Sequence, residues 1–154
     1  MKRFIKNFDQ TTVDFNDLFK LISIGDNDDG RSFVQDNYPS KDQILRSTFC
    51  IQDLHKSKFF YPLIQKLSDA YRLENIRLDA HAFVSFMTGN AGPAHVDNYD
   101  VLLYNLHGET MYIVEEDKYL VDAGDVIHIK AGEVHQSIAM KPRITFSLGI
   151  RKDL

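Results

Sequence analysis

The second half of the chain is a succession of short segments with the composition of β-strands, and this pattern constrains the fold more than any other feature. From residue 76 onward the segments are rich in aromatic and β-branched residues, with glycine, aspartate and proline at the joints between them. In order they are AHAFVSFMTG, DVLLYNL, ETMYIVE, KYLV, DVIHIK, VHQSIAM and RITFSLGI. Strands this short and this closely spaced are typical of a β-barrel or a β-sandwich.

The first 75 residues carry helical patterns, with no long strand evident between them. Apolar spacing and capping signals predict helices over residues 13–23, 40–45 and 61–73. Aromatic residues 59–61, at the head of the third helix, are expected in the core. Residues 1–10 fit either a short strand or a docked arm. The run GDNDDG lacks the closing glutamate of a calcium-binding EF-hand loop, so we expect a solvated turn there.

The length of 154 residues indicates a single domain that is long enough to bury a core. We expect residues 1–75 to form a helical N-terminal part that packs on a barrel made of residues 76–154. The predicted fold class is therefore mainly β with N-terminal helices, an α+β arrangement.

Charge and composition exclude several classes of function. A formal net charge of −4 gives no electrostatic footprint for nucleic acid or for a membrane surface. No apolar run approaches the roughly 18–20 residues of a membrane span, and no signal peptide is evident. The single cysteine, Cys50, fits a reducing compartment and is expected to be a buried structural thiol. We expect a cytoplasmic protein, with a homodimer formed through exposed strand edges as a reasonable guess.

Two segments of the β region together carry a metal ligand set. In GPAHVDNYDV, His95 and Asp97 are two residues apart, so they face the same side of an extended strand. In GDVIHIKAGEVHQ, His135 follows a tight turn at Gly132 and begins another strand. Each residue alone could be a polar rim or capping residue. Two imidazoles and one carboxylate, however, are the ligand set of a non-haem Fe(II) site with open coordination positions. We therefore predict a metal centre.

These segments resemble the cupin-type JmjC oxygenases, and in particular the branch that contains the bacterial ribosomal-protein hydroxylases. Those proteins carry a similar HxDxxDV segment, a glycine at the start of the next strand, and a Gly-Asp strand leading to the distal histidine. The matching positions here are His95, Asp97, Asp100, Val101, Gly108, Gly124, Asp125 and His135. The resemblance covers about residues 76–151 and includes the closing SLGIR. It implies a double-stranded β-helix (cupin, or jelly-roll) barrel, with Fe(II) on the two histidines and Asp97 and with 2-oxoglutarate as co-substrate.

One position departs from the family pattern. The family places a lysine or arginine two residues after the glycine that matches Gly108, where it pairs with the distal carboxylate of 2-oxoglutarate, and here that residue is Thr110. The alternative cation is Arg143, with Thr145 on the same strand face, because many other 2-oxoglutarate oxygenases use an arginine followed by a hydroxyl residue. A guanidinium can bind a carboxylate bidentately. Alternatively, Arg143 is a solvent-facing residue beside Pro142.

Strand parity suggests which other side chains reach the barrel interior. Asn105 shares the parity of the predicted ligands, and Thr110 and Tyr112 share one face of the next strand, so all three are candidates for contact with the co-substrate. Tyr104 has the opposite parity and is expected to pack outside. Glu133 is a conceivable fourth ligand in an exposed turn. The histidines at positions 81, 107 and 128 are expected to be strand or turn residues and not ligands.

Three functions remain open. The first is an Fe(II)- and 2-oxoglutarate-dependent hydroxylase that acts on a small molecule or a protein side chain. The second is a metal-binding cupin enzyme that uses no keto acid, which Thr110 favours. The third is a non-catalytic barrel that binds a ligand or a protein partner. The sequence does not identify the substrate.

Overall fold

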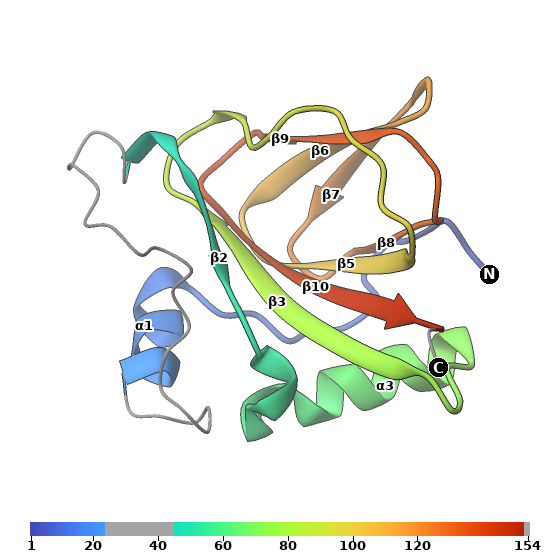
Figure 1. Ribbon diagram of the computed structural model, residues 1–154. Coiled ribbons are helices and arrows are strands. Elements are labelled where there is room, and N and C mark those ends of the chain that lie inside the picture. Colours follow the sequence, from blue (N-terminus) through green and yellow to red (C-terminus); the bar gives the residue numbers. More distant parts are fainter. Residues whose placement is uncertain (24–44, 153–154) are drawn as a thin grey trace.

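The structure, a computed structural model, describes residues 1–23 and 45–152. Two antiparallel sheets enclose the interior, and segments from the N-terminal half lie against the outer face of the larger sheet (Figure 1). This is the double-stranded β-helix that the sequence predicts. None of the helices in the described ranges is long and apolar enough to cross a membrane.

The larger sheet has six strands, and all neighbouring strands are antiparallel. Their order across the sheet is β1 (Phe4–Ile5), β8 (Val126–Ile129), β5 (Asp100–His107), β10 (Arg143–Arg151), β3 (Arg77–Ser85) and β2 (Thr48–Ile51). The smaller sheet has the order β4 (Gly89–Asn90), β9 (His135–Ala139), β6 (Glu109–Val114) and β7 (Asp117–Asp122). Each of the seven predicted strand segments corresponds to an observed strand.

The helices covering the larger sheet are close to those predicted. Helix α1 runs over Phe15–Ser23 and helix α3 over Tyr61–Tyr71, preceded by two short 3-10 turns, η1 (Leu54–Lys56) and η2 (Lys58–Phe60). Helix α3 has a proline in its first turn and stops where Arg72 adopts a left-handed conformation. The GDNDDG run and residues 40–44 of the second predicted helix lie outside the described residues.

The first 75 residues also contribute two short strands, β1 and β2, and both join the six-stranded sheet. Strand β1 matches the short-strand alternative predicted for residues 1–10, whereas β2 was not predicted. Strand β2 is only four residues long and pairs with β3, so its stability comes from a partner distant in sequence rather than from its own pattern. Cys50 lies on this strand and is partly buried. Burial raises the pKa of its thiol to about 11, which fits an unreactive structural residue.

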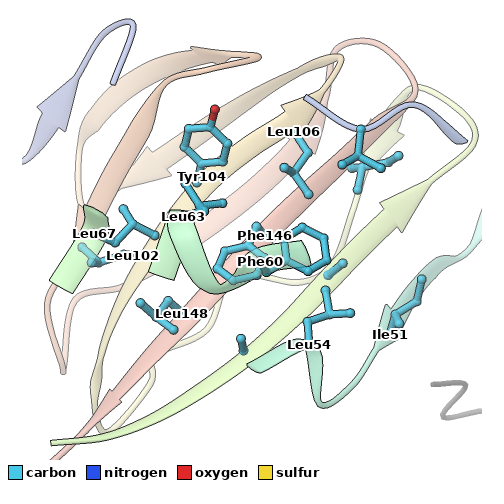
Figure 2. Packing of buried hydrophobic residues seen from close by; sticks show 14 of the residues in the cluster. Ile51, Leu54, Phe60, Leu63, Leu67, Leu102, Tyr104, Leu106, Phe146 and Leu148 are labelled. Atoms are coloured by element: carbon cyan, nitrogen blue, oxygen red, sulfur yellow. The ribbon is translucent and has the colours of Figure 1, made fainter. Parts of the chain in front are cut away.

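The main hydrophobic core lies between the outer face of the six-stranded sheet and the N-terminal segments (Figure 2). Phe60 stacks on Phe146 of β10 with ring centroids 5.1 Å apart. Tyr104 points to this outer face, as its parity predicts, and its hydroxyl donates to the Asp9 and Thr11 carbonyls at 3.1 and 2.6 Å. Of the three aromatic residues expected in the core at the head of α3, only Phe60 is buried, because residues 59 and 61 point outward from the helix start.

Alternation along the strands sends the other set of side chains into the barrel. On β5, Val101 and Leu103 face inward and join a second apolar cluster, while Leu102 and Tyr104 face the outer core. The same alternation on β10 sends Arg143 and its alternate neighbours inward and the large apolar residues between them outward. Strand parity and register therefore determine which polar groups surround the interior cavity.

Candidate metal centre and its cavity

His95, Asp97 and His135 lie together at the mouth of a cavity inside the barrel. The Nε2 atom of His95 is 3.8 Å from one Asp97 carboxylate oxygen, and the Nε2 atom of His135 is 3.4 Å from the other. One ligand atom from each residue lies within 4.8 Å of the other two, so the group could hold a metal ion. Such spacing suits a single ion with metal–ligand bonds of about 2.0–2.2 Å.

The geometry that brings these residues together differs from the predicted one. His95 and Asp97 do not lie on a regular strand, because the chain between β4 and β5 is irregular. His95 instead forms an isolated bridge with His135, in which the N–H of each residue donates to the carbonyl of the other at 3.0 and 2.9 Å. The Gly132 N–H also donates to the Asp97 carbonyl at 2.9 Å, which ties the two segments together.

Backbone carbonyls orient both imidazoles. The Nδ1 atom of His95 lies 3.0 Å from the Pro93 carbonyl oxygen, and that of His135 lies 3.0 Å from the Glu133 carbonyl oxygen. Because a carbonyl only accepts hydrogen bonds, each Nδ1 acts as the donor, and Nε2 is the ring nitrogen that faces Asp97. The His95 side chain is 51% exposed and that of His135 only 6%. The group therefore stands at the entrance, open to solvent on the His95 side.

A cavity of about 190 Å³ extends inward from this entrance. Its walls include apolar residues of β3 and β5, such as Phe83, Val101 and Leu103, and its inner part reaches Tyr112 and Arg143. His81 also lines it, which the sequence did not indicate. The Nδ1 atom of His81 is buried and has no hydrogen-bond partner, and desolvation lowers its pKa against the opposing effect of Asp79.

Arg143 is buried, with 2% of its surface exposed, so the alternative of a solvent-facing residue is wrong. Strand register explains its contacts. Ser85 is its partner across the β10–β3 ladder and accepts from Nε at 3.1 Å, while Thr145 accepts from Nη1 at 3.0 Å. No ion pair joins this guanidinium to a carboxylate within residues 1–23 and 45–152. Burial lowers its pKa because a desolvated cation is unfavourable.

Two neutral groups in the interior have unused hydrogen-bonding capacity. The hydroxyl groups of Tyr112 and Thr110 are both buried without a hydrogen bond of good geometry. Burial raises the pKa of the Tyr112 phenol, and Arg143 and Thr145 act in the opposite direction, which places the phenol beside that pair. An unsatisfied buried hydroxyl costs about 1–3 kcal/mol, and of these two residues only Tyr112 lines the cavity, so its hydroxyl favours a ligand that supplies the missing partner.

Not all of the residues predicted to contact the co-substrate line the cavity. Arg143 and Tyr112 do, whereas Asn105, Thr110 and Thr145 are buried but do not contribute to its walls. The Asn105 amide donates to the Gly108 and Val121 carbonyls at 2.8 and 3.2 Å and accepts from Thr145 at 3.0 Å. Asn105 thus has its polar atoms committed within the protein, and it fixes the hydroxyl that contacts Arg143.

Gly108 marks the place where β5 turns into β6 beside this network. Its φ angle is +76°, and a Cβ atom there would lie 2.0 Å from the Pro142 carbonyl oxygen. Only glycine permits both the left-handed conformation and this close approach to the start of β10. The residue thus allows the strand that carries Thr110 and Tyr112 to begin directly against the segment that carries Arg143.

A second group of potential ligands is already engaged in other contacts. Ligand atoms of Asp53, His55 and Asp79 also lie within 4.8 Å of one another. However, Arg151 donates to the Asp79 carboxylate at 3.1 Å, and the Ala80 N–H donates to His55 Nδ1 at 3.3 Å. Glu133, the conceivable fourth ligand of the first group, is directed to Arg3.

Comparison with known proteins gives a consistent fold. Residues 82–145 match the family described as "Cupin domain". No curated protein matches the sequence. The structure is similar to that of YcfD, a ribosomal oxygenase from Escherichia coli in complex with cobalt and 2-oxoglutarate, with a TM-score of 0.72 and 18% identity. That similarity covers 98% of this chain and 48% of the other, so this chain spans about half the length of that protein.

Two further solved structures are also similar. KdgF from Halomonas sp. has a TM-score of 0.54 and 16% identity, covering 82% of this chain and 92% of its own. An RmlC-like cupin from Shewanella frigidimarina has a TM-score of 0.50 and 13% identity, covering 78% and 94%. At these identities the likeness concerns the fold alone. The chain therefore has the cupin fold, with a group of side chains at its cavity mouth that could hold a metal.

Proposed function

We propose that this cupin-fold protein is an Fe(II)- and 2-oxoglutarate-dependent oxygenase, with His95, Asp97 and His135 as the metal ligands. The observation that carries the proposal concerns Arg143. Its guanidinium is buried and has no carboxylate partner in the described residues. It lines the inner part of the cavity whose mouth holds the three proposed ligands. A metal ligand set alone would fit many cupin reactions. The buried cation adds a requirement for an anionic ligand.

The donor set suits the proposed metal. Two imidazoles and one carboxylate are the ligand set of non-haem Fe(II) oxygenases, and His95, Asp97 and His135 would supply that set here. The carbonyl partners of both Nδ1 atoms hold the Nε2 atoms ready to coordinate. Asp97 lies between the two imidazoles, so its carboxylate would balance part of the positive charge of the ion.

The inner part of the cavity suits the distal carboxylate of 2-oxoglutarate. Arg143 can offer guanidinium N–H groups to it, and the unpartnered Tyr112 hydroxyl can donate to it. Asn105 and Thr145 would hold the guanidinium in place through their hydrogen bonds. A bound carboxylate would thus satisfy polar groups that burial has left without partners.

The bound metal and co-substrate would supply the oxidising chemistry: O₂ would oxidise 2-oxoglutarate to succinate and CO₂, and the second oxygen atom would enter a C–H bond of the substrate as a hydroxyl group. The contribution of the protein is orientation and exclusion of water. Phe83, Val101 and Leu103 form apolar parts of the walls and would help to exclude water from a bound ligand. The substrate, a small molecule or a protein side chain, would approach from the exposed side of His95.

Calorimetry of 2-oxoglutarate binding to the iron(II)-loaded protein, under nitrogen, tests this function. We expect binding to the wild type only when metal is present, and at least about tenfold weaker binding to Arg143→Gln, since hydrogen bonds to charged groups contribute about 1.5–3 kcal/mol. Arg77→Gln, at an exposed arginine of β3, is the matched control and should bind like the wild type. If the iron-loaded wild type binds no 2-oxoglutarate, the proposed function is wrong.

A metal-dependent cupin enzyme that uses no keto acid is the second candidate. Thr110 favours it, because a neutral side chain stands where the resembled family carries a cation. The fold similarity to KdgF and to the RmlC-like cupin is compatible with it. The same titration separates the two candidates, since this second enzyme would bind the metal and remain indifferent to 2-oxoglutarate.

A further inference from the structure

We propose that Arg3 is a positioning residue for the metal centre, acting through Glu133 and the turn that precedes His135. This inference rests on the proposed function, because it assumes that His135 and Asp97 are metal ligands. It concerns a residue at the other end of the chain, outside the cavity, that no motif of the metal site includes.

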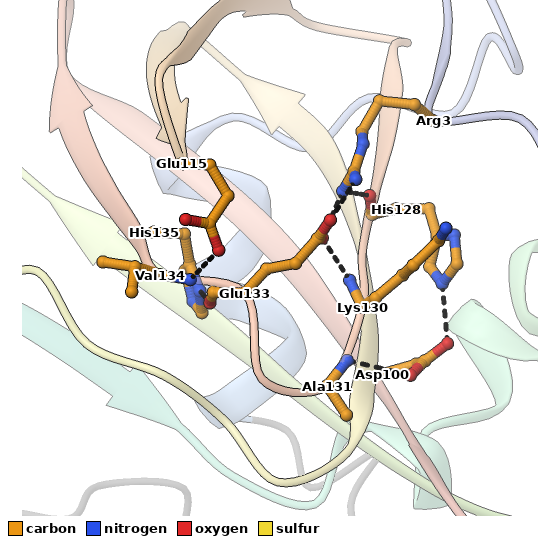
Figure 3. Close-up of polar contacts among 9 residues, drawn as sticks. All are labelled: Arg3, Asp100, Glu115, His128, Lys130, Ala131, Glu133, Val134 and His135. Atoms are coloured by element: carbon orange, nitrogen blue, oxygen red, sulfur yellow. Dashed lines mark hydrogen bonds and ion pairs between the residues drawn. The ribbon is translucent and has the colours of Figure 1, made fainter.

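A bidentate ion pair attaches Arg3 to this turn, and further hydrogen bonds attach Arg3 to His128 at the end of β8 (Figure 3). Both terminal nitrogens of its guanidinium donate to the Glu133 carboxylate, Nη1 to Oε2 at 2.6 Å and Nη2 to Oε1. Nη1 also donates to the His128 carbonyl at 2.6 Å, and the His128 N–H donates to the Arg3 carbonyl at 2.7 Å. The Arg3 and Glu133 side chains are only 27% and 20% exposed, so solvent competes weakly for this contact.

Carboxylates accept hydrogen bonds from three backbone N–H groups of the turn, residues 130–134. Glu133 accepts from the Lys130 N–H at 2.8 Å, Asp100 from the Ala131 N–H at 3.0 Å, and Glu115 from the Val134 N–H at 2.9 Å. Figure 3 shows that the Glu133 side chain links the turn to Arg3. Asp100 is in turn held by His128, whose Nε2 lies 2.9 Å from its other oxygen.

The turn is connected to two of the three proposed ligands. The Glu133 carbonyl lies 3.0 Å from His135 Nδ1 and so sets the tautomer and the plane of that imidazole. The Gly132 N–H donates to the Asp97 carbonyl at 2.9 Å and so fixes the backbone of the carboxylate ligand. Release of Glu133 from Arg3 would let residues 130–134 shift, and both ligands would lose their orientation.

The contact between Arg3 and Glu133 is bidentate and mostly shielded from solvent. A purely structural ion pair could have the same geometry. The two roles differ in what they do to metal binding: partners that orient ligands from outside the coordination sphere typically change metal affinity about 10–100-fold when removed, whereas an ordinary surface ion pair does not.

Cobalt(II) binding tests the proposal without relying on activity. The dissociation constant and the d–d absorption spectrum are measured for the wild type, Arg3→Gln, Arg3→Lys and Glu133→Gln, together with urea unfolding of the metal-free proteins. Lys6→Gln is the matched control, because Lys6 lies on the same segment and pairs at the surface with Asp122 at 3.3 Å and Asp125 at 3.5 Å. Glutamine at position 133 retains an acceptor for the Lys130 N–H.

We expect Arg3→Gln and Glu133→Gln to bind cobalt about tenfold more weakly, with an altered d–d spectrum, and Lys6→Gln to bind like the wild type. Arg3→Lys should be intermediate, since an ammonium keeps the charge but loses the bidentate geometry. The double variant should bind no more weakly than the weaker single variant, because both changes break the same contact.

Wild-type affinity and spectrum in Arg3→Gln would overturn this inference even if that variant were less stable, and would leave the proposed function intact. If Arg3→Gln fails to fold, Arg3→Lys and Glu133→Gln decide in the same way. Failure of the wild type itself to bind cobalt would contradict the proposed function and this inference together.

Discussion

Tyr112 and Tyr104 are two buried tyrosines on opposite sides of the barrel wall, and their hydroxyl groups have opposite environments. The Tyr104 hydroxyl donates to two carbonyl groups in the outer core. The Tyr112 hydroxyl makes no hydrogen bond of good geometry, and it lies close to Arg143 and Thr145, which both act to lower the pKa of the phenol. The first group therefore stabilises the fold, whereas the second is available to a ligand.

Tyr112→Phe should separate binding from stability. Because the Tyr112 hydroxyl makes no hydrogen bond of good geometry, its removal should change the free energy of unfolding of the metal-free protein by less than about 1 kcal/mol. Affinity of the iron-loaded protein for 2-oxoglutarate should fall by about two- to tenfold, the worth of one hydrogen bond. Urea denaturation and calorimetry give the two quantities.

Tyr104→Phe is the control for this prediction. It leaves the Asp9 and Thr11 carbonyls without their donor, so it should lower the free energy of unfolding by about 1–3 kcal/mol and leave 2-oxoglutarate affinity unchanged. The same stability loss in both variants, or unchanged binding in Tyr112→Phe, would contradict the role given to the Tyr112 hydroxyl.

Side-chain direction could be predicted at the residue scale wherever the strand is regular. Parity correctly sends Asn105 inward and Tyr104 outward, because β5 has no irregularity between these positions. Parity could not show that the hydrogen-bonding atoms of the Asn105 amide are already engaged within the protein, since the partners of this amide include carbonyls from other segments. Arg3 could not be predicted at all, because MKRF contains no pattern that indicates a contact with residue 133.

The N-terminal segment connects the elements on the outer face of the larger sheet. Asp9, between β1 and α1, pairs with Lys66 of α3, where Nζ lies 2.7 Å from the carboxylate. Burial acts to raise the pKa of Asp9, but hydrogen bonds from Lys66 and Thr11 outweigh it and hold the pKa below the ordinary value of 3.8. This contact should therefore stabilise the docking of the segment in a pH-dependent way.

The pH dependence has a definite sign. Since the pKa of Asp9 is lower in the folded state than 3.8, the contribution of the pair is fully present above that value and disappears as the pH falls through the folded-state pKa. Lys66 is half exposed, so we expect less than about 1 kcal/mol. Lys66→Gln should be slightly less stable than the wild type in urea at pH 7, and the difference should shrink below pH 3.

Lys20→Gln, at an exposed lysine of α1, serves as the control and should show no such pH-dependent difference. A difference between Lys66→Gln and the wild type that grows on acidification would show that the sign is wrong. A difference that is the same at both values of pH would assign the effect of Lys66 to packing of its side chain, not to the ion pair.

Elements with a strong local pattern could be predicted from the sequence, and those that depend on distant partners could not. Strand β3 and the strands from β5 to β10 correspond closely to the predicted segments, whereas the two-residue strand β4 was not predicted. Strand β2 was not predicted, because four residues are too few to show a clear strand pattern. Its extended conformation depends on its pairing with β3. The segment with His95 and Asp97 was predicted as extended, but its conformation is set by the bridge to His135.

The jelly-roll topology assembles the proposed site from parts that are far apart in the sequence. The larger sheet contributes Arg143 and His81, the smaller sheet contributes Tyr112 and His135, and the irregular segment between β4 and β5 closes the mouth. The ligand set could be proposed from two motifs, but the depth and polarity of the cavity follow only from the closed barrel. A homodimer and a single domain over all 154 residues stay predictions.

The central claim is that the metal and Arg143 form one binding site for 2-oxoglutarate, and thermal unfolding of the metal-loaded protein tests it most directly. At 2-oxoglutarate concentrations near 100 times the dissociation constant, ligand binding adds about 2.7 kcal/mol, which raises the unfolding midpoint by several degrees. We predict this shift for the iron-loaded wild type, no shift without metal, and a shift of at most about half that size in iron-loaded Arg143→Gln, as expected for binding that is at least about tenfold weaker. No shift in the iron-loaded wild type, or an equal shift in Arg143→Gln, would contradict the claim.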